Sequence, residues 1–149
     1  MREVTYKIII ENELRSLNAW KFAITQCETE LETMTAEYSA IKATSYDKMP
    51  VGSGENLQEE KLITAIAKKD QKEAELKLNK RKVADIERLI EQLPDDERRV
   101  IERMVINQEK YALDSLCEEL NCEQAQVYRI RSRAIRNMAK LRHGAAYHE

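Results

Sequence analysis

Glycine, proline and aromatic residues are scarce in this chain of 149 residues. It contains 3 Gly and 2 Pro, whereas average usage would give about 10 and about 7. Aromatic residues make up only 5% of the sequence. This composition disfavours a turn-rich β sandwich or barrel and favours long helices with narrow apolar seams. We therefore expect an all-α protein without catalytic activity.

Long apolar runs and paired cysteines are also missing. No run approaches the roughly 18 apolar residues of a membrane span, and no apolar stretch of signal-peptide length follows residues 1–7. The three cysteines, Cys27, Cys117 and Cys122, lack CxxC spacing. An odd number of unpaired cysteines is typical of a reducing compartment. We expect an intracellular protein that does not contact a membrane.

The few glycines and prolines divide the chain into three parts. Pro50, Gly52 and Gly54 cluster together, Pro94 is isolated, and Gly144 lies near the end. Nothing between these positions forbids continuous helix. The sequence predicts a helical hairpin over residues 1–93 with its reversal at about 43–57. A second domain over 94–143 and a tail over 144–149 follow.

Apolar residues in the predicted hairpin recur at alternating steps of three and four. In the first helix the series is Leu17, Trp20, Ile24, Cys27, Leu31, Met34, Tyr38 and Ile41, with a weaker extension back to Glu13, Ile10 and Tyr6. In the second helix it is Leu76, Asn79, Val83, Ile86, Ile90 and Leu93, with an upstream part at Leu62 and Ile66 that Lys69, Lys72 and Glu73 interrupt. This spacing predicts a coiled-coil-like antiparallel hairpin.

A single helix cannot bury such a stripe alone, so any apolar surface that the hairpin leaves uncovered is available to a second copy of the chain. We expect a homodimer or higher homo-oligomer. The residues that we assign to the hairpin or oligomer seam are Leu17, Trp20, Ile24, Leu31, Leu76, Val83 and Ile90. Asn79 at a seam position either fixes the register of the helices or points to the edge of the seam.

The last third of the chain has the pattern of a helix-turn-helix. Pro94 followed by three acidic residues is typical of a helix start, because negative charge suits the first turn. A polar connector over 107–111 precedes a segment with Leu113, Leu116, Cys117 and Leu120 on one face. Asn121 then tolerates the left-handed conformation of a tight turn. A final helix over about 124–142 places Val127, Ile130, Ala134, Met138 and Leu141 inward.

The other side of that final helix is basic. Residues 124–148 contain no acid, although the whole chain has 25 Lys and Arg against 27 Asp and Glu. A basic helix of this kind fits the major groove of DNA, where Arg and Gln read base edges and other cations meet phosphates. We assign base contacts to Gln124, Gln126 and Arg129. Phosphate contacts are assigned to Arg133, Arg136, Lys140, Lys110 and Tyr111.

The runs LPDDERRVIERMVI and ALDSLCEELNCEQAQVYRIRSRAIRNMAKLR resemble region 4 of bacterial sigma factors and its relatives. The similarity covers about residues 93–142. The layout as a whole, with MPVGSG at 49–54 between two long helices, resembles phage and prophage transcriptional regulators of the RinA/ArpU-like kind. This resemblance implies a DNA-binding regulator of phage genes, often late genes, which acts in the bacterial cytoplasm without a catalytic step.

The chain departs from sigma factors at the start of the recognition helix. Gln124, Ala125 and Gln126 stand where sigma factors typically carry Arg-Glu-Arg. A dedicated operator is therefore a better expectation than a standard −35 element. Nothing resembles the other sigma regions, so we expect a regulator that contacts RNA polymerase at most as a partner.

Two other functions fit parts of this sequence. A helical adaptor that binds RNA polymerase or another phage or host protein through the basic helix is the alternative to DNA binding. A zinc site from Cys117, Cys122, His143 and His148 is disfavoured, because about 20 helical residues, roughly 30 Å, separate the two pairs. We expect no metal and no cofactor.

Overall fold

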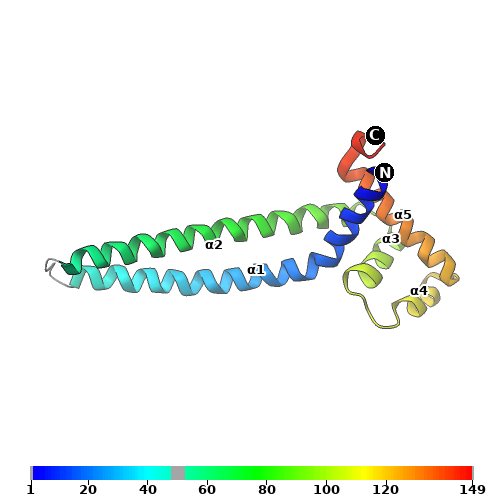
Figure 1. Ribbon diagram of the computed structural model, residues 1–149. Helices are drawn as coiled ribbons and strands as arrows, with labels where there is room; N and C mark the ends of the chain where they lie inside the picture. The colour runs from blue at the N-terminus through cyan, green and yellow to red at the C-terminus, as the bar shows by residue number, and fades with distance from the viewer. Residues whose placement is uncertain (1, 48–52, 149) are drawn as a thin grey trace. The chain divides into compact units, whose positions relative to one another are not determined.

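The computed structural model describes residues 2–47 and 53–148, and no strand occurs among them. These residues form five α-helices and two short helical turns, and Figure 1 shows their arrangement. The α-helices are α1 (Arg2–Asp47), α2 (Ser53–Glu91), α3 (Asp95–Val100), α4 (Ala112–Leu120) and α5 (Gln124–His143). The turns are the π-helical η1 (Ile101–Ile106) and the 3₁₀-helical η2 (Gly144–His148). The predicted all-α fold, a helical hairpin followed by smaller helices, is confirmed.

The two long helices are longer than predicted. α1 continues to Asp47 and α2 begins at Ser53, so helix extends into the reversal that was placed at 43–57. No glycine or proline precedes Pro50 in this part of the sequence, and nothing therefore interrupts the helix there. Most of the segment 49–54 lies outside the described residues.

The chain forms two compact units that differ from the predicted domains. One unit comprises Met1–Trp20 with Lys82–Glu149, and the other comprises Lys21–Arg81. The start of α1 and the end of α2 thus pack with the small helices instead of ending at a boundary before Pro94. The reason is that both helix ends are apolar on the face that meets α5 and α3, and burial of this surface adds to the core of the first unit.

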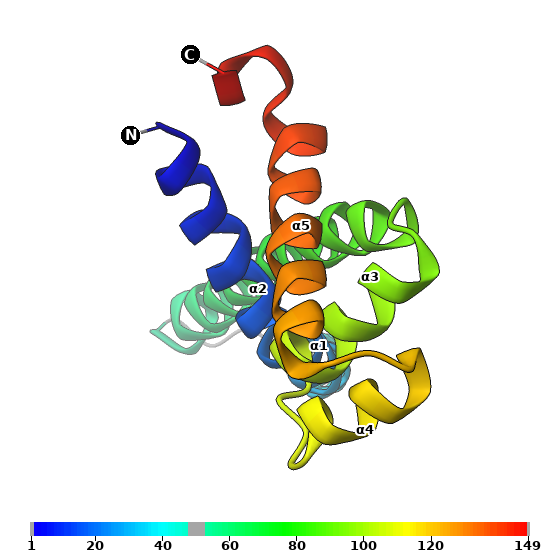
Figure 2. The same cartoon turned by 90° about the vertical axis from the view of Figure 1, so that its right-hand side faces the viewer.

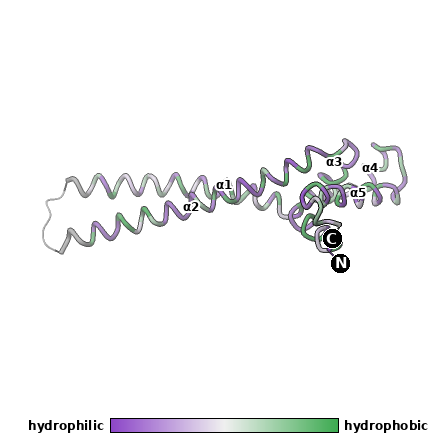
Figure 3. The backbone as a smooth tube through the Cα atoms, turned by 90° about the horizontal axis from the view of Figure 1, so that it is seen from above, coloured by the Kyte–Doolittle hydropathy of each residue, from purple (hydrophilic) through white to green (hydrophobic). Residues whose placement is uncertain are grey.

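The unit of residues 21–81 is an antiparallel pair of helices held by a narrow seam. In α1 the seam follows the prediction. The predicted positions Ile24, Cys27, Leu31, Met34, Tyr38 and Ile41 are buried or half-buried, and Ala23 beside Ile24 is half-buried as well. Salt bridges join the two helices across the seam edge, with Lys72 Nζ 2.6 Å from Glu30 Oε2 and Lys80 Nζ 3.3 Å from Glu28 Oε1. Figure 3 shows hydrophobic and hydrophilic residues alternating along both helices.

The seam of α2 is continuous at Lys69 and Lys72, where the sequence predicted an interruption. Its half-buried residues in this unit are Gln58, Leu62, Ala65, Lys69, Lys72, Leu76 and Asn79, which continue the steps of three and four without a gap. Lys69 and Lys72 therefore occupy seam positions and cover the seam with their aliphatic stems. Ile66, which was predicted to lie in the seam, is instead 40% exposed. Ala65 lies in the seam instead, because residue 65 and not residue 66 continues the alternating steps of three and four between Leu62 and Lys69.

The other unit has a well-buried core. α1 contributes Ile10, Leu14 and Leu17, which are at most 2% exposed, and α2 contributes Val83, Ile86, Leu89 and Ile90. Trp20, assigned to the seam, is half-buried with the ammonium of Lys82 5.6 Å from its ring centroid. In Figure 2 the start of α1 lies beside α5, while α3 and α4 lie on other sides of the same helix.

Candidate nucleic-acid interface

A small apolar core joins the three helices that position the candidate interface. Val100 of α3, Leu116 of α4, and Val127 and Ile130 of α5 are at most 4% exposed and form one cluster. Met104, Leu113, Cys117, Leu120 and Cys122 pack against this cluster. The predicted inward positions in α4 and in the first half of α5 are confirmed here, and α5 is consequently fixed on α3 and α4.

The turn between α4 and α5 is a Schellman motif. Asn121 is left-handed, with φ of 50°, as the sequence predicts. The N–H of Cys122 donates to the carbonyl of Cys117 at 3.1 Å, and the N–H of Asn121 donates to that of Glu118 at 3.4 Å. These two bonds satisfy the last carbonyls of α4 and stop the helix. α5 therefore starts at a defined position and angle.

The start of α3 also follows the prediction. The helix begins at Asp95, directly after Pro94. Asp96 Oδ1 accepts a hydrogen bond from the backbone N–H of Glu97 at 2.8 Å, so an acid does satisfy one of the open groups of the first turn. Arg98 Nη2 donates to the carbonyl of Leu93 at 3.1 Å and ties α3 to the end of the α2 connection.

α5 is buried over a wider face than the sequence indicated. Ala134 and Met138 are fully buried as predicted, but Ile135 and Ala139 are buried as well. Leu141 is 49% exposed, so its predicted inward position is wrong. The cause is that α5 packs against α3, against α4 and against the start of α1, whose approach shifts the buried face away from Leu141.

The solvent side of α5 carries most of the residues assigned to DNA contact. Arg129 and Arg136 are exposed. Arg129 Nη1 donates to Gln126 Oε1 at 3.4 Å, which places two assigned base-reading side chains together. Arg136 has no ion pair with any residue that the structure describes. Lys140 lies 5.9 Å from the ring centroid of Tyr147 and is otherwise exposed.

Arg133 is engaged inside the domain. Its Nε donates to Glu97 Oε1 at 2.7 Å and its Nη2 donates to Asp96 Oδ2 at 3.0 Å. The hydrogen bond to Glu97 raises the pKa of Arg133 above its usual value, so the guanidinium stays charged. Glu97 is only 1% exposed and also accepts from Asn137 Nδ2 at 3.0 Å. The assigned phosphate contact of Arg133 remains a prediction, but this side chain already has two acidic partners.

Two further cations of α5 have acidic partners on α1. Arg131 pairs with Glu11, and Arg142 pairs with Glu13. Residues 124–148 themselves contain no acid, as the sequence shows, but these two charges are neutralised by acids from outside the segment. The acids come from elements distant in sequence, which spacing along α5 alone could not show. Arg129, Arg136 and Lys140 are the α5 cations without an ion pair among the described residues.

The remaining assigned residues lie near the first helix of the motif. Gln124 Nε2 lies 3.5 Å from Asp114 Oδ1 of α4. Lys110 and Tyr111 lie in the connector before α4, and the Lys110 ammonium is 5.3 Å from the Tyr111 ring centroid. Tyr111 is 68% exposed and left-handed, with φ of 66°. Lys110 and Tyr111 precede the start of α4 and are therefore distant in sequence from the basic residues of α5.

One exposed residue of α5 escaped the sequence reasoning. Tyr128 is 50% exposed and follows the fully buried Val127. A large aromatic side chain on the solvent side of a recognition helix can contact a thymine methyl group or a sugar. Its exposure could have been predicted from its position, because residue 128 does not belong to the apolar series of Val127, Ile130 and Ala134.

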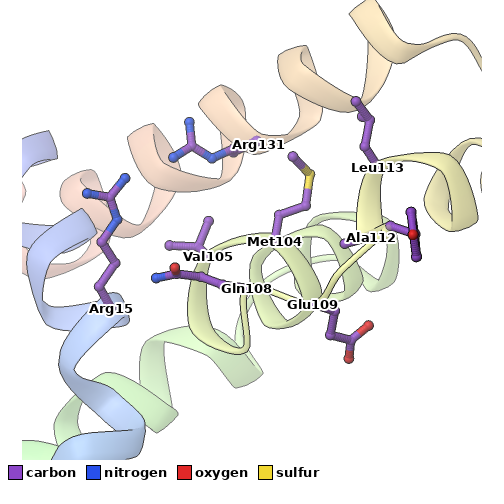
Figure 4. A pocket seen from close by; sticks show the side chains of 9 residues that line it. Arg15, Met104, Val105, Gln108, Glu109, Ala112, Leu113 and Arg131 are labelled. Carbon is purple, nitrogen blue, oxygen red and sulfur yellow. The ribbon is translucent and has the colours of Figure 1, made fainter.

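The opposite side of α5 borders an open pocket of about 450 Å³ (Figure 4). Its lining is apolar at Met104, Val105 and Leu113 and basic at Arg15 and Arg131. Both arginines donate to Oε1 of Glu11. The pocket therefore has its two guanidinium groups already neutralised in part by a side chain of the same unit.

The C-terminal tail is folded on the same unit. Tyr147 of η2 is 2% exposed, and its ring centroid lies 6.4 Å from that of Tyr6. His143 stacks on Tyr6 with a centroid distance of 3.9 Å. The predicted tail over 144–149 thus contributes a core residue, because the apolar ring of Tyr147 covers the ends of α1 and α5.

Residues 40–139 match the family model described as "Protein of unknown function (DUF1492)". No curated protein and no solved structure matches the chain. None of the helices in the described ranges is long and apolar enough to cross a membrane. The same ranges contain no group of three or more His, Cys, Asp or Glu side chains that could hold a metal ion.

Proposed function

The chain belongs to the DUF1492 family, and we propose that it is a sequence-specific DNA-binding transcriptional regulator. One observation carries this proposal. α5 follows a tight turn after α4, is fixed on a core shared with α3 and α4, and exposes Arg129, Arg136 and Lys140 without ion pairs among the described residues. Fixed cations on an exposed helix favour binding to the phosphates and base edges of a major groove.

The proposed roles follow from position along α5. In a helix-turn-helix the N-terminal residues of the second helix contact base edges. Gln126, Tyr128 and Arg129 lie in the first two turns of α5 and are proposed to read bases, together with Gln124. Arg136 and Lys140 lie further along and are proposed to contact phosphates, as are Lys110 and Tyr111 before α4.

We further propose that the protein is encoded by a phage or prophage, acts on phage gene expression in the bacterial cytoplasm, and belongs with the RinA/ArpU-like regulators. The sigma region 4-like run of residues 93–142 supports this assignment. RNA polymerase is then a possible second partner of the same domain. The alternative, a helical adaptor, would use α5 or the pocket beside Arg131 to bind another protein and would not need DNA.

Self-association of the hairpin would place two recognition helices on two half-sites. Among the residues of the unit 21–81 whose burial the structure describes, Cys27 is the one buried apolar residue, whereas Phe22, Leu57, Ile63 and Leu78 are more than half exposed. This apolar surface supports a homodimer, because a second copy would cover it. Sedimentation equilibrium of the full chain should give twice the monomer mass, and a monomer at all concentrations would contradict the dimer.

The test of DNA binding is a mobility shift with fragments of the genome that encodes the protein, followed by selection of the protected fragments. We expect a defined operator. Arg129→Ala should reduce the preference for the operator over random DNA, whereas Lys140→Ala should weaken both alike. Binding to a polymerase column without any DNA shift would favour the adaptor. Equal effects of both substitutions on the two DNAs would contradict the assigned roles.

A further inference from the structure

Cys117 and Cys122 occupy the two contact positions of the Schellman motif that ends α4. The backbone N–H of Cys122 donates to the carbonyl of Cys117 at 3.1 Å. Such a bond holds the two Cα atoms within about 7 Å of each other. In this motif the side chains of the two residues commonly touch. The fold thus places the thiols next to each other across the turn.

The surroundings of the two thiols confirm that they share one environment. Both are partly buried and pack against the same cluster of Val100, Leu116, Val127 and Ile130. Burial raises the pKa of the Cys117 thiol, and the neighbouring Cys122 raises it further. The third cysteine, Cys27, lies in the other unit and is 3% exposed.

We propose that Cys117 and Cys122 are a redox-active dithiol that low-molecular-weight disulfides convert into an intramolecular bridge. A disulfide spans Cα separations of about 4.4–6.8 Å, and the hydrogen bond of the turn limits the separation here to about 7 Å. The thiols are free in the structure, so the reaction requires an oxidant. This site is independent of the DNA-binding proposal, because it needs only the turn.

The reaction balances as two thiol–disulfide exchanges. One cysteine thiolate attacks the disulfide of the oxidant, forms a mixed disulfide and releases one thiolate of the oxidant. The second cysteine thiolate then attacks the protein sulfur of the mixed disulfide and releases the other half. The protein loses two electrons and two protons, and the oxidant becomes two thiols after protonation.

The bridge would close the turn that leads into α5, because Cys122 is two residues before Gln124. The backbone bonds of the turn would then open less often. Amide hydrogen exchange at Asn121 and Cys122 should therefore slow in the oxidised protein relative to the reduced one. Exchange in the unit of residues 21–81 should not change.

The test uses the full chain, oxidised glutathione as the probe, and mildly alkaline buffer in which thiolate is available. After the reaction, remaining thiols are alkylated in denaturant and counted by mass. We expect one alkylated cysteine, Cys27, and a protein that has lost two hydrogens. Cleavage after Glu118 or Glu119 should leave two peptides held together until a reductant is added.

Matched variants separate this outcome from others. Cys27→Ser should still form the bridge, whereas Cys122→Ser should not lose two hydrogens and should carry glutathione at Cys117 or stay reduced. The folded pair should also bridge at an oxidised-to-reduced glutathione ratio about tenfold lower than the same chain in urea. Three free thiols, separate glutathione adducts on both cysteines, or equal bridging in urea would overturn the proposal.

Discussion

The guanidinium Nε of Arg133 on α5 donates to Oε1 of Glu97 on α3 at 2.7 Å, and Glu97 is 1% exposed. The sequence places these residues 36 positions apart. An arginine assigned to DNA phosphate is therefore also the partner of the buried acid of the domain. Loss of Glu97 would leave Nε of Arg133 and Nδ2 of Asn137 without this acceptor, which links the placement of α5 to the stability of the domain.

Substitution of Glu97 should destabilise the domain. Glu97→Ala removes the acceptor of Asn137 and one of the two acidic acceptors of Arg133, and we expect a loss of about 2–4 kcal/mol in the free energy of unfolding. Glu97→Gln should lose less because it keeps an acceptor oxygen. Urea unfolding measures both. The control is Asp95→Ala, since Asp95 is exposed and its ion pair, with Arg99 at 3.1 Å, lies on the surface. A loss as large as that of Glu97→Ala would show that the buried acid has no special role.

Arg136→Ala should weaken DNA binding without regard to sequence. Arg136 has no ion pair among the residues that the structure describes, so it is available to a phosphate. Three such cations that are assigned to phosphates, Arg136, Lys140 and Lys110, would give a slope of log affinity against log salt of about −2.7 per protomer. Removal of Arg136 should make that slope less negative by about 0.9.

Fluorescence anisotropy of labelled duplexes at several salt concentrations gives these slopes. Arg88→Ala is the matched control, because it removes one exposed cation from α2 and not from α5. The slope of the control should equal that of the wild type. If Arg88→Ala and Arg136→Ala change the slope equally, net charge and not the α5 surface determines the affinity.

The register of the hairpin predicts opposite outcomes for two apolar residues of α2. Leu76 is half-buried in the seam, and Leu76→Ser should cost about 1–2 kcal/mol of unfolding free energy. Ile66 is 40% exposed, and Ile66→Ser should change it by less than about 0.5 kcal/mol. Thermal unfolding at fixed protein concentration compares them. A larger loss for Ile66→Ser would indicate that Ile66 is covered by a second copy, and sedimentation would then show dissociation.

Stability should fall in mild acid because of His143. Burial, and to a smaller extent the charge of Arg142, lowers the pKa of His143 from its usual 6.5, and its ring stacks on Tyr6. The unfolded chain therefore binds a proton more readily than the folded chain. The contribution of neutral His143 to the free energy of unfolding is therefore complete above about pH 6.5. It is lost as the pH falls from there toward the lower pKa that His143 has in the folded chain.

The comparison of wild type with His143→Phe isolates this effect, since Phe keeps the stacking on Tyr6 but cannot be protonated. Between neutral and mildly acidic pH the unfolding temperature of the wild type should fall more than that of the variant. Acids such as Glu13, which pairs with Arg142, titrate in both proteins. If the unfolding temperatures of the two proteins fell equally with pH, His143 would not contribute to the pH dependence of stability.

Local patterns determined the elements of this protein. Pro94 marks the start of α3, Asn121 adopts the left-handed turn, and the steps of three and four through Cys27 and Leu31 define the seam of α1. These features depend on neighbouring residues along one helix or turn, and periodicity therefore detects them. The inward face of α5 was predicted for the same reason, apart from Leu141.

Partners distant in sequence could not be predicted in this way. The pairing of Arg133 with Glu97, of Arg131 with Glu11 and of Arg142 with Glu13 depends on how α1 and α3 pack on α5. The same packing buries Tyr147 and separates the cations that remain without ion pairs from those that stabilise the domain. The sequence by itself determined that a basic helix follows a tight turn. Only the tertiary structure decided which of its charges face solvent, because the acids that neutralise the others are brought to α5 by folding.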